Sequence, residues 1–243
     1  MKGLRRFLAS KITSYLKGRA RRKMQQAAPL LFDFLVRTDS PSTGCSFSDY
    51  WALYSYIRKA KPRCVLELGS GVSTMVIAYA LCENQQKGDE PAQFVSIDES
   101  EDYLAATRQL LVGPFNEEVQ LLHSSSVEKR WGPFVGRGYQ TIPDLPYDFV
   151  FVDGPQYERE TSFDVDLLEL VSKSSTPITA MVDSRAGSCI IYSLYLKPKF
   201  SFDRFQNIGW LTGATKKDLA TFHHVIAREL GGRSLKRTIT LGL

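Results

Sequence analysis

Two aspartates, Asp153 and Asp183, stand where apolar runs of this 243-residue chain end, after FVFV and ITAMV. If these runs form neighbouring parallel strands, the two carboxylates lie about 5 Å apart, which is the spacing between strands. A carboxylate pair at that distance can take a proton from a hydroxyl group or bind a divalent cation. The pair is therefore the first candidate for a catalytic site.

A glycine-rich stretch and a further aspartate follow two other apolar runs. Gly69 and Gly71 come after the run RCVLEL, where a buried strand must turn sharply into a helix. Without side chains there, a ligand can approach the backbone of the turn. Asp98 ends the run QFVSID, at the place where a carboxylate accepts ribose hydroxyls. A tight turn or a helix cap explains each feature taken singly, but the acidic strand ends together favour a nucleotide-type ligand.

The elements that must position these residues follow from alternating strand and helix patterns. We expect strands at 63–68, 93–98, 118–123, 147–153 and 177–183, and helices at 73–83, 101–111, 160–172 and 186–196. Repeated strand–helix units predict an α/β domain with a doubly wound, mostly parallel sheet and helices on both faces. In such sheets ligands bind at the carboxyl ends of the strands, where the acidic residues fall.

The remaining segments have weaker patterns. Residues 28–60 are expected to be helical, with Ser46 or Ser48 as a cap. We predict a long loop at 124–146, and two late strands in KFSFDRF and TFHHVIARE with NIGWLTGATKKD as their connection. His223 and His224 are adjacent, so on a strand they point to opposite faces, and we interpret them as structural.

The segments LELGSGVST, FVSIDES, YDFVFVDG and ITAMVD resemble motifs of the class I S-adenosylmethionine-dependent methyltransferases, over roughly residues 60 to 200. The resemblance implies a Rossmann-like methyltransferase fold with N-terminal helices added, and S-adenosylmethionine as the cofactor. Asp98 would hold the ribose, and Ser125 or Ser126 would replace the acid or amide that meets adenine in many relatives. The full set of cofactor-binding residues implied by the resemblance is Glu67, Gly69, Ser70, Gly71, Ser73, Thr74, Asp98, Ser125 and Asp153.

The predicted reaction is methyl transfer to a hydroxyl of a small molecule or sugar, which makes the chain an O-methyltransferase. Such a transfer needs in-line positioning and removal of a proton. The catalytic candidates are Asp153, Asp183 and His123, the histidine having the more suitable unperturbed pKa. In metal-dependent relatives an asparagine follows the second aspartate, whereas this chain has Ser184. A direct base is therefore favoured over a divalent cation such as Mg²⁺, and the metal ligands stay unknown.

Two other functions remain as alternatives. A nicotinamide-dependent Rossmann enzyme would carry a third glycine three positions after the second, but Thr74 occupies that position. A catalytically inactive cofactor-binding or interaction protein of the same fold would bind the cofactor without turnover. A panel of acceptors would separate this alternative from an enzyme.

The net charge of +5 is unevenly distributed along the chain. Residues 1–23 carry nine lysines and arginines and no acid, so the rest has a net charge of −4. This distribution does not indicate a nucleic-acid-binding face. We therefore divide the chain into a basic segment, 1–27, and a methyltransferase-like α/β domain, 28–243.

The basic segment is expected to be an amphipathic helix. Its apolar residues recur at steps of three and four positions: Leu4, Phe7, Leu8, Ile12, Tyr15 and Leu16. Three hypotheses stay open for it: packing on the domain, binding of an anionic membrane or a partner, and an organellar targeting peptide.

The cysteines and the hydropathy indicate the compartment. Four cysteines without paired metal spacing are typical of reduced thiols in an intracellular protein. We find no apolar run of about 20 residues and no signal-peptide core. The expected location is the cytoplasm, with a peripheral membrane position as an option.

Overall fold

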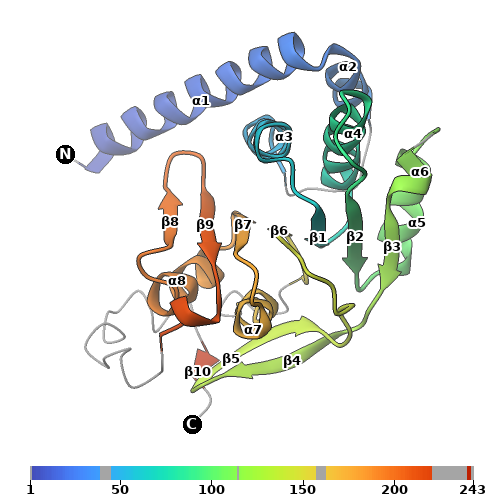
Figure 1. The fold of residues 1–243 in the computed structure, drawn as a ribbon. Coiled ribbons are helices and arrows are strands. Elements are labelled where there is room, and N and C mark those ends of the chain that lie inside the picture. The colour runs from blue at the N-terminus through green and yellow to red at the C-terminus, as the bar shows by residue number, and fades with distance from the viewer. Residues whose placement is uncertain (1, 39–44, 114, 157–162, 221–239, 242–243) are drawn as a thin grey trace.

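The computed structural model describes residues 2–38, 45–113, 115–156, 163–220 and 240–241. A seven-stranded sheet with the order β3-β2-β1-β6-β7-β9-β8 forms its centre (Figure 1). The five strands from β3 to β7 run parallel, whereas β9 pairs antiparallel with both β7 and β8. These strands are β1 Cys64–Leu68, β2 Gln93–Asp98, β3 Gln120–His123, β6 Phe149–Val152, β7 Ile178–Asp183, β8 Phe200–Asp203 and β9 Ile208–Ala214.

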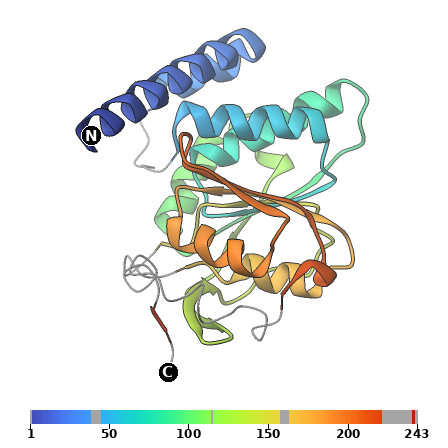
Figure 2. The same cartoon turned by 90° about the vertical axis from the view of Figure 1, so that its left-hand side faces the viewer.

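Helices cover both faces of the sheet. Helices α3 and α4 lie on one face, outside them lies α1, and α7 and α8 cover the other face (Figure 2). Strand order reverses between β1 and β6, which confirms the predicted doubly wound, mostly parallel α/β fold. The helices are α1 Lys2–Ala27, α2 Pro29–Arg37, α3 Phe47–Ala60, α4 Val72–Gln86, α5 Glu101–Leu110, α6 Phe115–Glu118, α7 Asp166–Lys173 and α8 Ala186–Tyr195, with a 3-10 turn at Lys216–Asp218.

The apolar runs form the strands because continuous apolar sequence suits a strand that is covered on both faces. Strands β1 and β6 are buried along their whole length, as expected for central parallel strands covered by helices on both faces. The predicted strand 93–98 coincides with β2, and the other four differ from the observed strands by one to three residues. Helix α3 begins after Ser46, one of the two predicted caps, in a capping box with Asp49.

The predicted loop at 124–146 is wrong over residues 126–139. Strands β4 Ser126–Trp131 and β5 Phe134–Tyr139 form a hairpin there, and β10 Thr240–Leu241 pairs with β5. The sequence prediction missed this hairpin because β5 contains two glycines, which weaken a strand pattern. Gly136 and Gly138 are required there, since a Cβ at these positions would overlap Phe163 and Asp166, respectively.

Ion pairs fix the hairpin on helix α7. Lys129 Nζ lies 2.7 Å from Asp166 and 2.8 Å from Glu169, and Asp166 is fully buried. A buried carboxylate is tolerated when it is paired and hydrogen-bonded, and Asp166 also accepts a hydrogen bond from the Tyr139 amide at 2.8 Å.

A second correction concerns the late strands. The segment that we predicted as a connection, 207–218, contains β9, which pairs with β7 through positions such as Met181 and Trp210. Its two glycines lower strand propensity, yet pairing on both sides overrides this preference. The predicted strand TFHHVIARE, with His223 and His224, lies outside the described residues.

The described part of the basic segment forms one helix, α1, which ends at Ala27. No helix in the described part of the chain is long and apolar enough to cross a membrane. All four cysteines are free thiols; Cys64, Cys82 and Cys189 are buried, and Cys45 is half-buried.

Candidate functional site

The turn between β1 and α4 lies at the carboxyl edge of the sheet. Gly69 adopts φ +95°, a left-handed conformation that favours glycine. A Cβ at Gly69 would lie 2.7 Å from the amide nitrogen of Gly154, so the turn packs directly on the loop after β6. The first amides of α4 have no acceptor inside the helix, and such a helix start can bind a carboxylate.

Glu67 lies fully buried beneath this turn. Its Oε2 accepts hydrogen bonds from Thr74 Oγ1 at 2.5 Å and Ser96 Oγ at 2.7 Å. Its Oε1 has no hydrogen-bond partner among the described residues. Burial raises the pKa of Glu67 to about 7, against the opposing effect of the Ser73, Ser96 and Thr74 hydroxyls. Glu67 therefore offers one unsatisfied acceptor, which fits an ammonium donor.

Thr74 holds the turn in shape rather than facing outward. Its hydroxyl accepts a hydrogen bond from the Gly71 amide at 3.0 Å while donating to Glu67. The side chain is fully buried, as is almost all of Ser73. The predicted cofactor residues Ser73 and Thr74 are thus brought to the start of α4, with Thr74 positioning the backbone.

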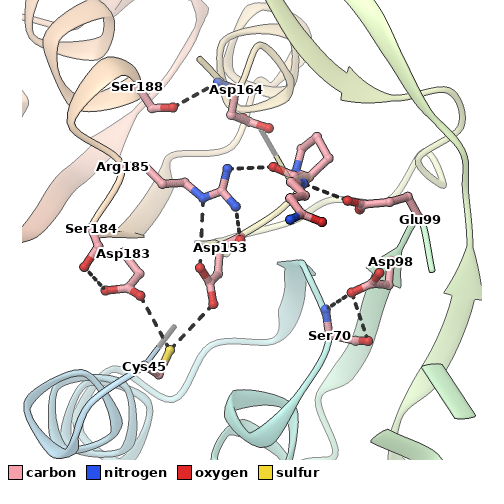
Figure 3. A network of polar contacts seen from close by, with 12 residues as sticks. Cys45, Ser70, Asp98, Glu99, Asp153, Asp164, Asp183, Ser184, Arg185 and Ser188 are labelled. Carbon is pink, nitrogen blue, oxygen red and sulfur yellow. Dashed lines mark hydrogen bonds and ion pairs between the residues drawn. The ribbon is translucent and has the colours of Figure 1, made fainter. Parts of the chain in front are cut away.

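Asp98 ties the end of β2 to the glycine-rich turn (Figure 3). Its Oδ2 accepts from the amide of Ser70 at 2.8 Å and from the Ser70 hydroxyl at 3.2 Å. Its Oδ1 accepts from the Ser100 amide at 2.8 Å. Burial raises the pKa of Asp98, and these hydrogen bonds oppose the rise. A carboxylate has about four acceptor positions, so one remains for a ligand hydroxyl.

Glu99 joins three segments and has no counterpart in the sequence prediction. Its Oε1 accepts from the Gln156 amide at 2.7 Å, and its Oε2 accepts from the Tyr139 hydroxyl at 3.0 Å. It therefore links the end of β2 to the loop after β6 and to the hairpin. No local pattern marks this role, because its partners lie 40 and 57 residues away.

Asp153 and Asp183 meet at the ends of β6 and β7, as the sequence predicts. Cys45, which lies before α3, approaches both: its Sγ is 3.7 Å from an oxygen of each carboxylate (Figure 3). One ligand atom from each of the three side chains lies within 4.8 Å of the others. The role of Cys45 was missed, because 108 and 138 residues separate it from its partners.

The carboxyl pair is set to hold protons unusually tightly. Burial raises the pKa of Asp183 to about 8, and the nearby carboxylates of Asp49 and Asp153 raise it further. Burial raises the pKa of Asp153 to about 6, while the Arg185 guanidinium lowers it. Burial and the neighbouring acids also raise the pKa of the Cys45 thiol well above its usual range. The thiol therefore stays protonated near neutral pH and can donate to either carboxylate.

Arg185 explains why the two aspartates differ. Its Nε lies 4.0 Å from Asp153 Oδ1, and its guanidinium donates to the backbone carbonyls of Asp153 and Pro155 (Figure 3). The cation favours the ionised form of the nearer carboxyl group. Ser184, at φ +44°, donates from its hydroxyl to Asp183 Oδ1 at 3.1 Å.

Three predicted residues lie apart from the pair. His123 is exposed on edge strand β3, and one ring nitrogen lies 3.1 Å from the Glu99 carbonyl oxygen. Three inter-strand steps separate β3 from β6, or about 14 Å. Ser125 is exposed just beyond β3, and Ser126 accepts from Arg137 at 2.8 Å. The structure thus brings Asp153 and Asp183 together but not His123.

The donor set at the pair does not fit Mg²⁺. Magnesium takes six oxygen ligands in near-ideal octahedral geometry. Here a thiol occupies the space between two carboxylates, and Arg185 places a fixed positive charge beside Asp153. We therefore derive no catalytic step through a metal ion.

Comparisons with known proteins identify the kind of domain that this chain resembles. Residues 66–179 match the family model of a methyltransferase domain. That range begins in β1, ends in β7 and contains Glu67, Asp98 and Asp153. The chain therefore matches a methyltransferase domain over these residues, and S-adenosylmethionine is the cofactor that such a domain implies.

Solved structures of low sequence identity share the fold. A methyltransferase from Geobacter sulfurreducens has a TM-score of 0.52 at 16% identity, covering 85% of this chain and 96% of that chain. A putative O-methyltransferase from Klebsiella pneumoniae has a TM-score of 0.53 at 14% identity, covering 82% and 96%. An O-methyltransferase from Bacillus cereus, in complex with S-adenosylhomocysteine, has a TM-score of 0.50 at 14% identity, covering 79% and 96%. No curated protein sequence matches the chain.

Proposed function

We propose that this chain transfers a methyl group from S-adenosylmethionine to a hydroxyl of a small molecule or sugar. The observation that carries the proposal is the carboxyl pair, Asp153 and Asp183, beside the glycine-rich turn. The loop that begins at Asp153 contacts Gly69 directly, so a ligand on the turn lies next to the pair. The O-methyltransferases among the structures of similar fold are consistent with a hydroxyl acceptor.

The residues around the turn match the cofactor's polar groups. The unpartnered oxygen of Glu67 suits the ammonium of its methionine part, and the start of α4 suits the carboxylate. The remaining acceptor position of Asp98 suits a ribose hydroxyl. Ser125 stays a proposal for the adenine side. When bound, the cofactor supplies a methyl group on a sulfonium, a good leaving group for in-line attack.

The carboxyl pair supplies the proton acceptor. As the acceptor oxygen forms its bond to the methyl carbon, its proton must leave. With pKa values of about 6 and about 8, Asp153 and Asp183 together hold one proton near neutral pH. We assign the base to Asp183, which can take the hydroxyl proton once the pair has released its shared proton, because a base is most effective when its pKa lies near the working pH.

The surroundings of the pair favour a polar acceptor. Arg185 and the exposed residue Gln156 lie on the loops beside Asp153, where they can meet hydroxyl or anionic groups. A sugar or another polyhydroxylated molecule, such as a glycan precursor, offers such groups. We therefore propose this acceptor class ahead of an apolar phenol.

Transfer of labelled methyl groups to a panel of sugars and phenols tests the function. We expect label in an ether linkage, with activity unchanged by a metal chelator because the donor set does not fit Mg²⁺. Activity that vanishes with chelator and returns with magnesium or manganese would overturn the direct-base assignment. Normal cofactor binding without turnover on any acceptor would instead indicate a binding protein that has lost catalysis.

A further inference from the structure

Helix α1 is attached to the domain through one face. Ala20 and Met24 are buried, Met24 completely, against the helical layer formed by α2 and α3. The Thr13 hydroxyl donates to the backbone carbonyl of Phe205 at 3.3 Å. The Arg21 guanidinium lies 4.7 Å from the ring centre of Phe47. These contacts fix which face of α1 points away from the domain.

The opposite face is exposed and basic. Lys11, Tyr15, Arg19 and Arg22 follow one another at steps of four, four and three residues, so they share one line along the helix. With 3.6 residues per turn, Tyr15 points about 140–180° away from Ala20 and Met24. All four side chains are exposed, and Tyr15 is 62% exposed. We call these four residues, together with Ile12, the outer face of α1.

Charge and apolar exposure occur together on the outer face. Residues 1–27 contain no aspartate or glutamate, so no acid within α1 neutralises its cations. Ile12 is 42% exposed beside Tyr15, in a helix that lies on the outside of α3 (Figures 1 and 2). Tyr15 lies on the side of the helix away from the buried contacts, and Ile12 lies on the flank, about 80° from Ala20, so packing on the domain does not account for the exposure of either side chain.

We infer that the outer face of α1 docks on the surface of an anionic lipid bilayer. Lysine and arginine near such a surface are attracted to acidic headgroups, and the attraction fades within a Debye length. Tyrosine combines an apolar ring with a polar hydroxyl and is enriched at membrane interfaces. A nucleic acid would use the cations but gives no role to the exposed Ile12. With only two apolar side chains on this face, binding should be reversible and sensitive to salt.

Co-sedimentation of the full chain with vesicles tests this inference without any need for turnover. We use phosphatidylcholine vesicles with and without phosphatidylserine, at about 0.1 M and about 1 M salt, where the Debye lengths are about 10 Å and 3 Å. We expect binding only to the anionic vesicles and only at the lower salt. Equal co-sedimentation with and without phosphatidylserine, or no binding in any condition, would overturn the inference.

Two charge-reversal variants separate the outer face from net charge. Lys11→Glu, Arg19→Glu and Arg22→Glu together should weaken vesicle binding by roughly tenfold or more, since three cations become anions. The matched control reverses Lys59, Lys87 and Arg108, which are exposed on other helices or at their ends and give the same change in charge. Equal losses in both variants would contradict docking through α1.

The same proteins provide the remaining checks. Tyr15→Ser should weaken vesicle binding several-fold while circular dichroism and S-adenosylhomocysteine binding stay as in the wild type. Tighter binding to single-stranded RNA or to polyglutamate than to anionic vesicles would overturn the lipid assignment. Because every readout is binding, failure here leaves the proposed methyl transfer untouched.

Discussion

Asp98→Ala is expected to weaken S-adenosylhomocysteine binding by about 10- to 100-fold, or ~1.5–3 kcal/mol, the range for a hydrogen bond to a charged group. The carboxylate has one free acceptor position for a ribose hydroxyl, and it also holds the Ser70 amide at 2.8 Å. The variant therefore loses a ligand contact and loosens the turn. Calorimetric titration measures both the affinity and the enthalpy of this loss.

A nearby acid provides the control for Asp98. Glu101→Ala removes an exposed carboxylate three residues further along, in the first turn of α5, without touching the glycine-rich turn. Its affinity for S-adenosylhomocysteine should equal that of the wild type. Unchanged affinity in Asp98→Ala would show that Asp98 does not bind the cofactor. It would also contradict the proposed placement of the ribose at the end of β2.

Asp183→Asn should lower kcat on a hydroxyl acceptor by about 10²- to 10⁴-fold, the usual contribution of a general base. Its affinity for S-adenosylhomocysteine should change little, because Asp183 lies on the acceptor side. The wild-type rate should rise with pH as the carboxyl pair loses its shared proton, and this dependence should disappear in the variant. Asp102→Asn, on an exposed helix start, is the control and should behave as the wild type. A variant with full activity would exclude Asp183 as the base.

The same substitution should change the pH dependence of stability. The pKa of Asp183 is about 8 in the folded chain, against 3.8 for the free group, so the folded state holds a proton that the unfolded state has released. Stability contributed by this group is therefore present below about pH 4 and is lost as pH rises through about 8, at about 1.4 kcal/mol per pKa unit.

Thermal unfolding at acidic and alkaline pH measures this loss. Glu67 and Asp153, whose pKa values are also raised, add a loss in the same direction, so the wild type should become less stable as pH rises. Asp183→Asn should lose less stability than the wild type over the same pH range. Each kcal/mol of that difference corresponds to about 2–4 °C in Tm. Identical pH dependence in both proteins would show that the pKa of Asp183 is not raised by folding.

The sequence was sufficient for the parallel part of the sheet and for the position of the site. Continuous apolar runs such as 93–98 specify buried strands, because both faces must be covered. Once those strands are parallel, their carboxyl ends share one edge, so Asp98, Asp153 and Asp183 had to be close. The pairing of Asp153 with Asp183 needed only the assumption that their strands are neighbours.

The parts that the sequence did not reveal depend on contacts far apart in the chain. Gly136 and Gly138 read as loop residues, yet they are required where β5 packs against Phe163 and Asp166. The sequence indicates only a reduced thiol at Cys45, whereas the fold places its sulfur beside Asp153 and Asp183. No periodic pattern records such contacts, because each belongs to a single long-range approach.

The structure of the chain with S-adenosylhomocysteine bound tests the central claim most directly. The account predicts the ribose on Asp98, the methionine part on the turn from Glu67 to Ser73, and the sulfur facing the Asp153–Asp183 pair. A ligand bound elsewhere, or one whose sulfur points away from both aspartates, would contradict it.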